Sequence, residues 1–147
     1  MESAGPEKSV LVCASCGATL STDLDQLTDP GMLSLADGTQ LLPDGLWCFA
    51  SASIAEEYCL AVAGQWLVSK ASTTNLVPTH LLGRQNGCCG FDGCDGPNLL
   101  CARCNSEVAT ERSDCWMAHS IAFHPQAVHR ISRPLAIDSR NAKRSDA

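Results

Sequence analysis

Two Cys-x-x-Cys pairs lie far apart in this 147-residue chain, one near its start and one in its last third. The first pair is Cys13 and Cys16, and the second pair is Cys101 and Cys104. Two thiols separated by two residues on a tight turn can bind the same metal ion, and two such pairs supply the four tetrahedral ligands that zinc takes in structural sites. The sequence therefore predicts one structural Zn²⁺ bound by Cys13, Cys16, Cys101 and Cys104.

The surroundings of both pairs are typical of zinc knuckles. Each pair follows a short apolar run and precedes a residue that tolerates a positive φ, Gly17 after the first pair and Asn105 after the second. Two other interpretations are four reduced core cysteines and a redox pair, but neither pair follows a thioredoxin-like βαβ pattern. Structural zinc contributes about 10–16 kcal/mol in small domains, so we expect removal of the metal to unfold this one.

The rest of the chain favours a mainly β fold, a small zinc-stabilised β-sheet domain with two zinc knuckles and room for one short helix. Short β-prone runs precede and follow the knuckles, and residues 46–49 and 65–68 read as further strands. Residues 51–63 fit a helix with Ser53 as its N-cap, although a strand fits them nearly as well. A last long strand is predicted over 115–124.

Charge divides the chain into an acidic body and a basic end. Residues 1–125 carry five Lys/Arg and fourteen Asp/Glu, whereas residues 126–147 carry five Lys/Arg and two Asp, which together give the net charge of −6. We therefore expect a flexible leader over 1–8, a zinc-binding β-rich domain over 9–125 and a basic, disordered tail over 126–147. An acidic body argues against nucleic acid as a partner, whereas the tail could contact an acidic partner or an anionic surface.

Neither a signal peptide nor a membrane span is expected. The first residues are acidic, and the longest apolar stretches fall far short of the ~20 residues that span a bilayer. We therefore expect a cytoplasmic protein in a reducing compartment, where paired cysteines bind metals more often than they form disulfides.

Six cysteines remain outside the knuckles. Cys48 and Cys59 have apolar neighbours and are interpreted as core residues. The others could be unliganded thiols that fill a core poor in aromatics, which we expect, or they could bind a second zinc. That second set would be drawn from Cys88, Cys89, Cys94, Cys115 and His119.

The position of His119 depends on local structure. A helical turn from Cys115 to His119 would bring both side chains to one ion. In a strand the two residues stand about 13 Å apart at ~3.3 Å per residue, too far to share one ion. The long strand predicted here therefore argues against a site that uses both.

Two distant Cys-x-x-Cys knuckles in a short β-rich chain resemble the zinc-stapled β-tent folds. These include Mss4-like and Yippee-like proteins, methionine sulfoxide reductase B and the cereblon ligand-binding domain. The segments Asn86–Asn98 and Thr110–Trp116 also resemble a group of small bacterial CxxC proteins, which implies no particular function.

The most favoured function is a non-enzymatic zinc-stabilised domain that binds a protein or a small ligand. One alternative is a thiol-based redox enzyme that uses Cys115, which follows Arg112 and precedes His119. The reductase resemblance gives this little support, because the reductase's Arg-x-Cys-x-Asn-Ser segment is matched only by the ending Cys104-Asn105-Ser106, and Cys104 is assigned to zinc.

A second alternative is an aromatic cage for a small ligand. It would be built from Trp47, Trp66 and Trp116, the only tryptophans of the chain. The simpler interpretation is that they pack in the core.

The acidic side chains Glu107, Glu111 and Asp114 are interpreted as solvated rather than as acid–base groups.

Overall fold

A computed structural model describes residues 7–57 and 63–134 of the chain. Its strands and helices, in chain order, are β1 (Glu7–Cys13), β2 (Asp25–Gln26), η1 (Pro30–Met32), β3 (Leu46–Phe49), α1 (Ala52–Glu57), β4 (Trp66–Val68), η2 (Lys70–Ser72), β5 (Leu76–Pro78), η3 (Leu82–Arg84), β6 (Leu99–Cys101), β7 (Glu107–Arg112), β8 (Ser120–Phe123) and β9 (Val128–Pro134). The protein is therefore mainly β, as the sequence predicts.

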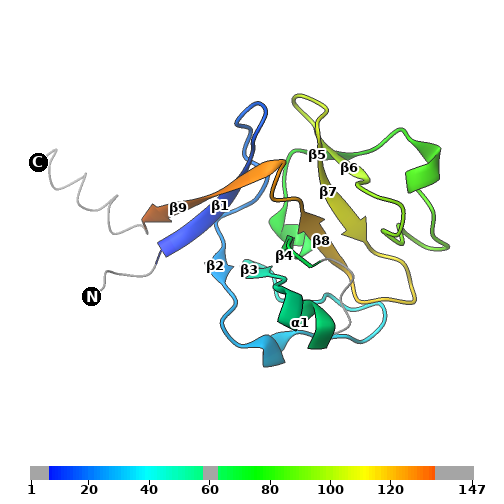
Figure 1. The fold of residues 1–147 in the computed structure, drawn as a ribbon, viewed down its shortest axis with the longest axis horizontal. Coiled ribbons are helices and arrows are strands. Elements are labelled where there is room, and N and C mark those ends of the chain that lie inside the picture. Colours follow the sequence, from blue (N-terminus) through cyan, green and yellow to red (C-terminus); the bar gives the residue numbers. More distant parts are fainter. Residues whose placement is uncertain (1–6, 58–62, 135–147) are drawn as a thin grey trace, which may run out of the picture.

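The strands form one sheet and a separate two-stranded ribbon (Figure 1). The sheet has the order β2-β3-β4-β8-β7-β6-β5, and only its β2–β3 pair is parallel. The ribbon pairs β1 with β9 in antiparallel register, from Glu7 opposite Pro134 to Cys13 opposite Val128. The first knuckle follows β1 and the second connects β6 to β7, so the ribbon and the sheet each carry one.

Two apolar clusters hold these parts together. The larger cluster joins the ribbon to the sheet and includes Leu11 of β1, Val128 of β9 and Phe123 of β8, all with no exposed surface. The second cluster contains Leu67 and Ala122, which alternate along β4 and β8 with residues of the first cluster. The central strands are thus buried on both faces, which explains why all four residues of β8 are buried without polar alternation.

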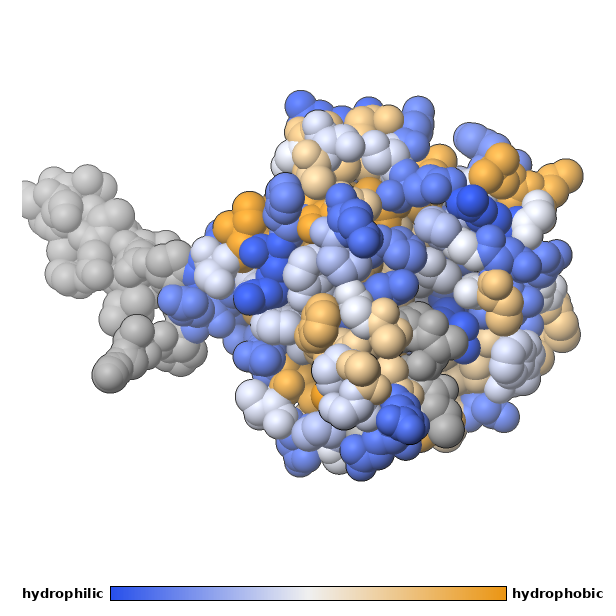
Figure 2. All heavy atoms as spheres, viewed as in Figure 1, coloured by the Kyte–Doolittle hydropathy of each residue, from blue (hydrophilic) through white to orange (hydrophobic). Residues whose placement is uncertain are grey.

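The surface presents no single large apolar area on the face shown in Figure 2, where hydrophobic groups form separate small patches among hydrophilic ones. Within residues 7–57 and 63–134, no helix has the length and apolar character needed to cross a membrane.

Strand β9 corrects the predicted domain boundaries. The sequence places residues 128–134 in a disordered tail and residues 7 and 8 in a flexible leader, yet residues 128–134 pair with residues 7–13 in the ribbon. Two basic side chains of β9 contact the rest of the domain. Arg133 forms a 3.0 Å ion pair with Asp23, and Arg130 lies over the ring of Trp47. The remaining leader and tail residues, 1–6 and 135–147, lie outside the described residues.

The predicted helix is present over the described residues Ala52–Glu57, and its N-cap is a different serine. The hydroxyl of Ser51, rather than that of Ser53, accepts the backbone N–H of Ile54 at 3.2 Å, so Ser51 is the capping residue of α1. The described part of the helix ends at Glu57, and residues 58–62 of the predicted 51–63 segment lie outside the described residues.

The predicted strand over 115–124 begins only at Ser120. Residues 115–119 form a loop, because the carboxylate of Asp114 accepts the backbone N–H of Cys115 and the indole N–H of Trp116, which turns the chain. The strands predicted over 46–49 and 65–68, before both knuckles and after the second knuckle are present, within a residue or two at their ends. The strand predicted after the first knuckle, over residues 18–20, is reduced to an isolated β-bridge between Thr19 and Val12.

Candidate metal centres

The two knuckles bring the four predicted cysteines together. The sulfur atoms of Cys13, Cys16, Cys101 and Cys104 all lie within 4.8 Å of one another. Two close contacts cross between the knuckles: Cys13 Sγ lies 3.6 Å from Cys104 Sγ, and Cys16 Sγ lies 3.6 Å from Cys101 Sγ. These distances connect chain segments that are 91 and 85 residues apart.

Both knuckles have the same local geometry. The backbone N–H of Gly17 donates to the carbonyl of Cys13 at 2.8 Å, and the N–H of Asn105 donates to the carbonyl of Cys101 at 2.8 Å. Gly17 has φ 78° and Asn105 has φ 65°, the positive values that the sequence predicts for the residue where each knuckle reverses. Matching backbones present two pairs of sulfur atoms to each other.

The donor set fits a zinc ion. Zn–S bonds of about 2.3 Å at a tetrahedral centre place neighbouring sulfurs about 3.8 Å apart, close to the observed 3.6 Å. Cys13 and Cys101 are buried, whereas Cys16 and Cys104 are half-buried, so an ion at this position would be enclosed by protein. We refer to these four residues as the knuckle cluster.

The pKa values of two thiols in the knuckle cluster, Cys104 and Cys16, shift in opposite directions. Hydrogen bonding to Ser106 lowers the pKa of Cys104 to about 6, and its sulfur lies 3.2 Å from the Ser106 hydroxyl oxygen. The backbone N–H of Ala18 acts to lower the pKa of Cys16, but burial and the three neighbouring thiols together raise it to about 11. Four thiolates at this spacing repel one another, and a divalent cation among them removes that repulsion.

A second group of cysteines lies at the other end of β7. Cys88, Cys89 and Cys115 are exposed, and their sulfur atoms lie within 4.8 Å of one another and of an Asp114 oxygen. Cys88 Sγ lies 3.3 Å from Cys89 Sγ and 3.7 Å from Cys115 Sγ. We refer to the three cysteines as the loop cluster.

Asp114 is the residue that orders this cluster. Its carboxylate is buried, with 1% of the residue exposed, and each oxygen accepts two hydrogen bonds. One oxygen accepts the backbone N–H groups of Cys89 and Cys115, both at 2.8 Å. The other accepts the N–H of Cys88 at 3.0 Å and the indole N–H of Trp116 at 2.9 Å. These donors, led by the N–H of Cys89, hold the pKa of Asp114 far below its usual range.

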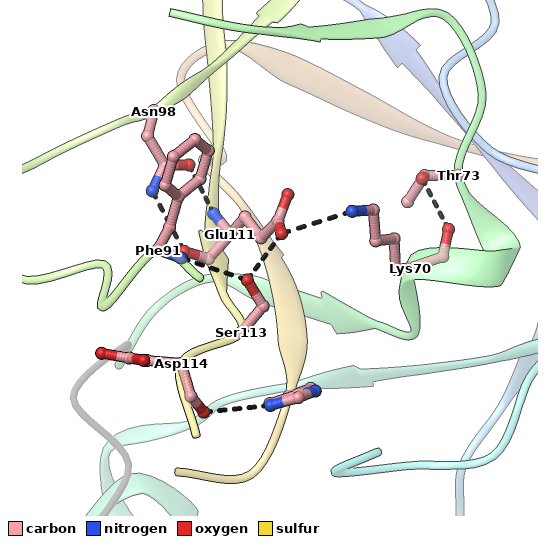
Figure 3. A network of polar contacts seen from close by, with 8 residues as sticks. Lys70, Thr73, Phe91, Asn98, Glu111, Ser113 and Asp114 are labelled. Carbon is pink, nitrogen blue, oxygen red and sulfur yellow. Dashed lines mark hydrogen bonds and ion pairs between the residues drawn. The ribbon is translucent and has the colours of Figure 1, made fainter. Parts of the chain in front are cut away.

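The loop that carries Cys88 and Cys89 is fixed to the sheet by further polar contacts (Figure 3). Phe91 and Ser113 are joined twice, because the N–H of Ser113 donates to the carbonyl of Phe91 at 2.8 Å and the N–H of Phe91 donates to the Ser113 hydroxyl at 3.3 Å. The Ser113 hydroxyl donates in turn to Oε2 of Glu111 at 2.6 Å, and Lys70 donates to the same oxygen at 3.4 Å.

Asn98 also fixes this loop to β7. It has no exposed surface, and its side-chain amide bonds both backbone groups of Glu111, accepting from the N–H at 2.6 Å and donating to the carbonyl at 3.0 Å. The loop is thus fixed to β7 at both of its ends. Glu111 and Asp114, interpreted from the sequence as solvated, are instead buried. The Asp-Cys sequence offers one signal for Asp114, since Asp often bonds nearby backbone N–H groups in turns.

The structure separates the other candidates from the loop cluster. Cys94 donates its backbone N–H to the Asp92 carboxylate at 2.9 Å and is not a member of the group. The ring Nε2 of His119 lies 3.0 Å from the backbone carbonyl oxygen of Asp114, and His119 is not a member of the group. Cys48 is buried in the second apolar cluster, and Cys59 lies outside the described residues.

The environment of Cys115 does not favour a nucleophilic thiolate. Hydrogen bonding with Cys89 and then with Cys88, together with partial desolvation, raises the pKa of Cys115 to about 12. Arg112, which precedes Cys115 in the sequence, instead donates to the carbonyl of Asp92 at 3.3 Å. A catalytic cysteine needs a lowered pKa, so these contacts oppose that role.

The three tryptophans have different surroundings. Trp47 is buried in the larger apolar cluster and contacts Arg130, and Trp66 packs edge-on against Phe49 with ring centroids 6.4 Å apart. Trp116 is 54% exposed and is held beside the loop cluster by Asp114. The hollow of about 300 Å³ next to Lys70 and Glu111 is lined by none of them.

Comparison with known proteins adds no relative: neither family models, nor curated proteins, nor solved structures give a match to this chain.

Proposed function

We propose that this protein is a non-enzymatic domain stabilised by one structural Zn²⁺ at Cys13, Cys16, Cys101 and Cys104, and that it serves to bind a protein or a small ligand. The observation that carries the proposal is the convergence of these four sulfur atoms within 4.8 Å. Four cysteine ligands close the coordination sphere of zinc, and closed sites are structural rather than catalytic.

A zinc ion at the knuckle cluster would join the ribbon to the sheet. Cys13 ends β1 of the ribbon, and Cys101 ends β6 of the sheet. A metal ion here would fasten the two β units to each other at one end, in addition to the apolar cluster between them. We infer a zinc-stapled β-tent architecture from this arrangement, in which two β units carry one knuckle each.

The binding role is proposed for the surface next to β5 and β7. A hollow of about 300 Å³ lies there, the lower end of the range in which small molecules bind proteins. Its lining includes the ion pair of Lys70 with Glu111, whose N···O distance is 3.4 Å, and the apolar side chains of Leu76 and Ile121. Polar groups at an apolar wall suit a small polar ligand or a peptide side chain.

The test of the staple uses a variant in which Cys88, Cys89 and Cys115 are all replaced by Ser, so that only the knuckle cluster remains. We expect this purified variant to retain one zinc per chain by elemental analysis. Prolonged treatment with a strong chelator should remove the zinc and abolish the cooperative thermal unfolding transition, because the binding free energy of a structural zinc is folding free energy.

Single substitutions provide the matched comparison. Cys101→Ser should give an unfolded or insoluble chain, whereas Cys48→Ser, at another buried cysteine outside the cluster, should keep zinc at an unchanged ratio. A folded variant without zinc, or a Cys101→Ser chain with full zinc content and stability, would falsify the proposed staple.

A further inference from the structure

We propose that the loop cluster is a second metal site, in which Cys88, Cys89 and Cys115 bind one thiophilic ion such as Zn²⁺ and leave its fourth coordination position open to solvent. This site is independent of the knuckle cluster and lies at the other end of strand β7. The proposal stands on three observations: the spacing of the sulfurs, the contacts of Asp114, and the exposure of the group.

The sulfur spacing suits a common ion. The distances of 3.3 Å and 3.7 Å from Cys88 Sγ to Cys89 Sγ and Cys115 Sγ approach the about 3.8 Å expected between thiolates on one zinc. The knuckle cluster shows 3.6 Å for the corresponding contacts. Cys88 and Cys115 are 27 residues apart in the chain, and the three sulfurs thus lie close to the spacing that a shared metal requires.

Asp114 is a positioning residue for this site and not its fourth ligand. A carboxylate has about four lone-pair directions, and N–H groups of Cys88, Cys89, Cys115 and Trp116 occupy all four. Three of these donors are the backbone amides of the three cysteines themselves. One buried carboxylate therefore fixes every backbone segment from which a ligand sulfur extends.

The resulting site differs in charge and access from the knuckle cluster. Binding of Zn²⁺ by three thiols releases three protons and gives a complex of net charge −1, against −2 for four thiolates. All three cysteines are exposed, so water or an incoming donor atom can reach the fourth position. Zinc with three protein ligands and an open position is the arrangement that exchanges ligands.

Metal stoichiometry of the full-length protein tests the site. Under reducing conditions and with Zn²⁺ in excess before desalting, we expect two zinc ions per chain in the unmodified protein. Cys88→Ser, Cys89→Ser and Cys115→Ser should each reduce the ratio to one while thermal unfolding stays cooperative. The control Cys94→Ser removes an exposed thiol of the same loop and should leave the ratio at two.

Cobalt reports on the open position. Co²⁺ loaded into the protein should give thiolate-to-metal absorption from both sites, and added imidazole should change the visible spectrum of the unmodified protein but not that of Cys115→Ser. Asp114→Asn should weaken binding at the loop cluster by about 10–100-fold, as loss of a residue that orients metal ligands does.

Three results would overturn the proposal. The first is one zinc per chain in the reduced, zinc-saturated protein. The second is equal alkylation of Cys88, Cys89 and Cys115 with and without zinc. The third is a disulfide among these cysteines that persists under the reducing conditions of the assay. None of these results contradicts the proposed zinc site at the knuckle cluster, because that site is tested separately on a variant without Cys88, Cys89 and Cys115.

Discussion

The guanidinium carbon of Arg130 lies 4.4 Å from the centre of the Trp47 ring, so the ribbon strand β9 contacts strand β3 of the sheet through a cation–π pair. Arg130 also donates to the hydroxyl of Ser9 at 2.8 Å, while Trp47 is only 6% exposed. Arg130 thereby connects the ribbon to the sheet by a contact that complements the knuckle cluster.

Replacing Arg130 by Ala should therefore lower the free energy of unfolding by about 1 kcal/mol. Arg133→Ala is the matched control, because its ion pair with Asp23 is about half exposed and should contribute less than about 0.5 kcal/mol. Urea denaturation followed by tryptophan fluorescence measures both variants. Equal effects of the two substitutions would show that the contact with Trp47 adds no stability.

A second prediction concerns the packing of β9. Val128 has no exposed surface and belongs to the larger apolar cluster, whereas Ile131 on the same strand is 45% exposed. Val128→Ala should cost about 2 kcal/mol, because it removes buried methyl groups and leaves a cavity, and Ile131→Ala should cost less than about 1 kcal/mol. Thermal unfolding of the two variants checks this order. A reversed order would place β9 outside the folded core.

A third prediction concerns pH. Burial lowers the pKa of His124 below its ordinary 6.5, with Glu107 acting in the opposite direction. The unfolded chain then binds a proton that the folded chain does not, so the stability contributed by neutral His124 decreases as the pH falls below about 6.5. The ring Nε2 lies 2.9 Å from the Thr110 hydroxyl oxygen, a contact that a glutamine amide can partly replace.

Comparison with His124→Gln isolates this effect from metal loss, which acid causes in both proteins. The unfolding free energy of the unmodified protein minus that of the variant should decrease between about pH 7.5 and about pH 5.5. Denaturant titrations at several pH values give this difference. Parallel pH profiles for the two proteins would contradict the assignment.

The knuckle cluster could be predicted from the sequence because its determinants are local. The spacing of Cys13 and Cys16, followed by Gly17, already specifies a turn that presents two sulfurs, and the second knuckle repeats that chemistry. Sequence spacing cannot show that the knuckles meet, but the four-ligand preference of zinc makes the pairing a natural expectation.

Strand β9 and Asp114 could not be predicted because their partners are distant in the chain. Arg130 of β9 is held by its contacts with Ser9 and Trp47. The sequence does not show these distant partners, so the basic run around Arg130 has the pattern of a solvated tail. Asp114 likewise accepts the N–H groups of Cys88 and Cys89 from a loop about 25 residues earlier. The wrong choice of N-cap for α1 has a local cause, because Ser51 and Ser53 are both suitable capping residues and their hydroxyl oxygens lie 3.3 Å apart.

The last prediction tests whether the backbone of the loop determines the geometry of the loop cluster. A Cβ atom on Gly90 would overlap the backbone carbonyl and the hydroxyl of Ser113. Gly90→Ala should therefore separate the Phe91–Ser113 hydrogen-bonded pair and move Cys88 and Cys89 away from Cys115. Because no thiol is removed, a lower metal affinity would result from displaced ligands alone.

Gly83→Ala is the matched control, because a Cβ there meets no atom within 4 Å. We expect Gly90→Ala to lose the zinc of the loop cluster on desalting, to retain the zinc of the knuckle cluster, and to be about 1–3 kcal/mol less stable, the range for overpacking a close contact. Gly83→Ala should match the unmodified protein in zinc content and unfolding. If Gly90→Ala kept two zinc ions and full stability, the close approach of Gly90 to Ser113 would not be what positions the three thiols.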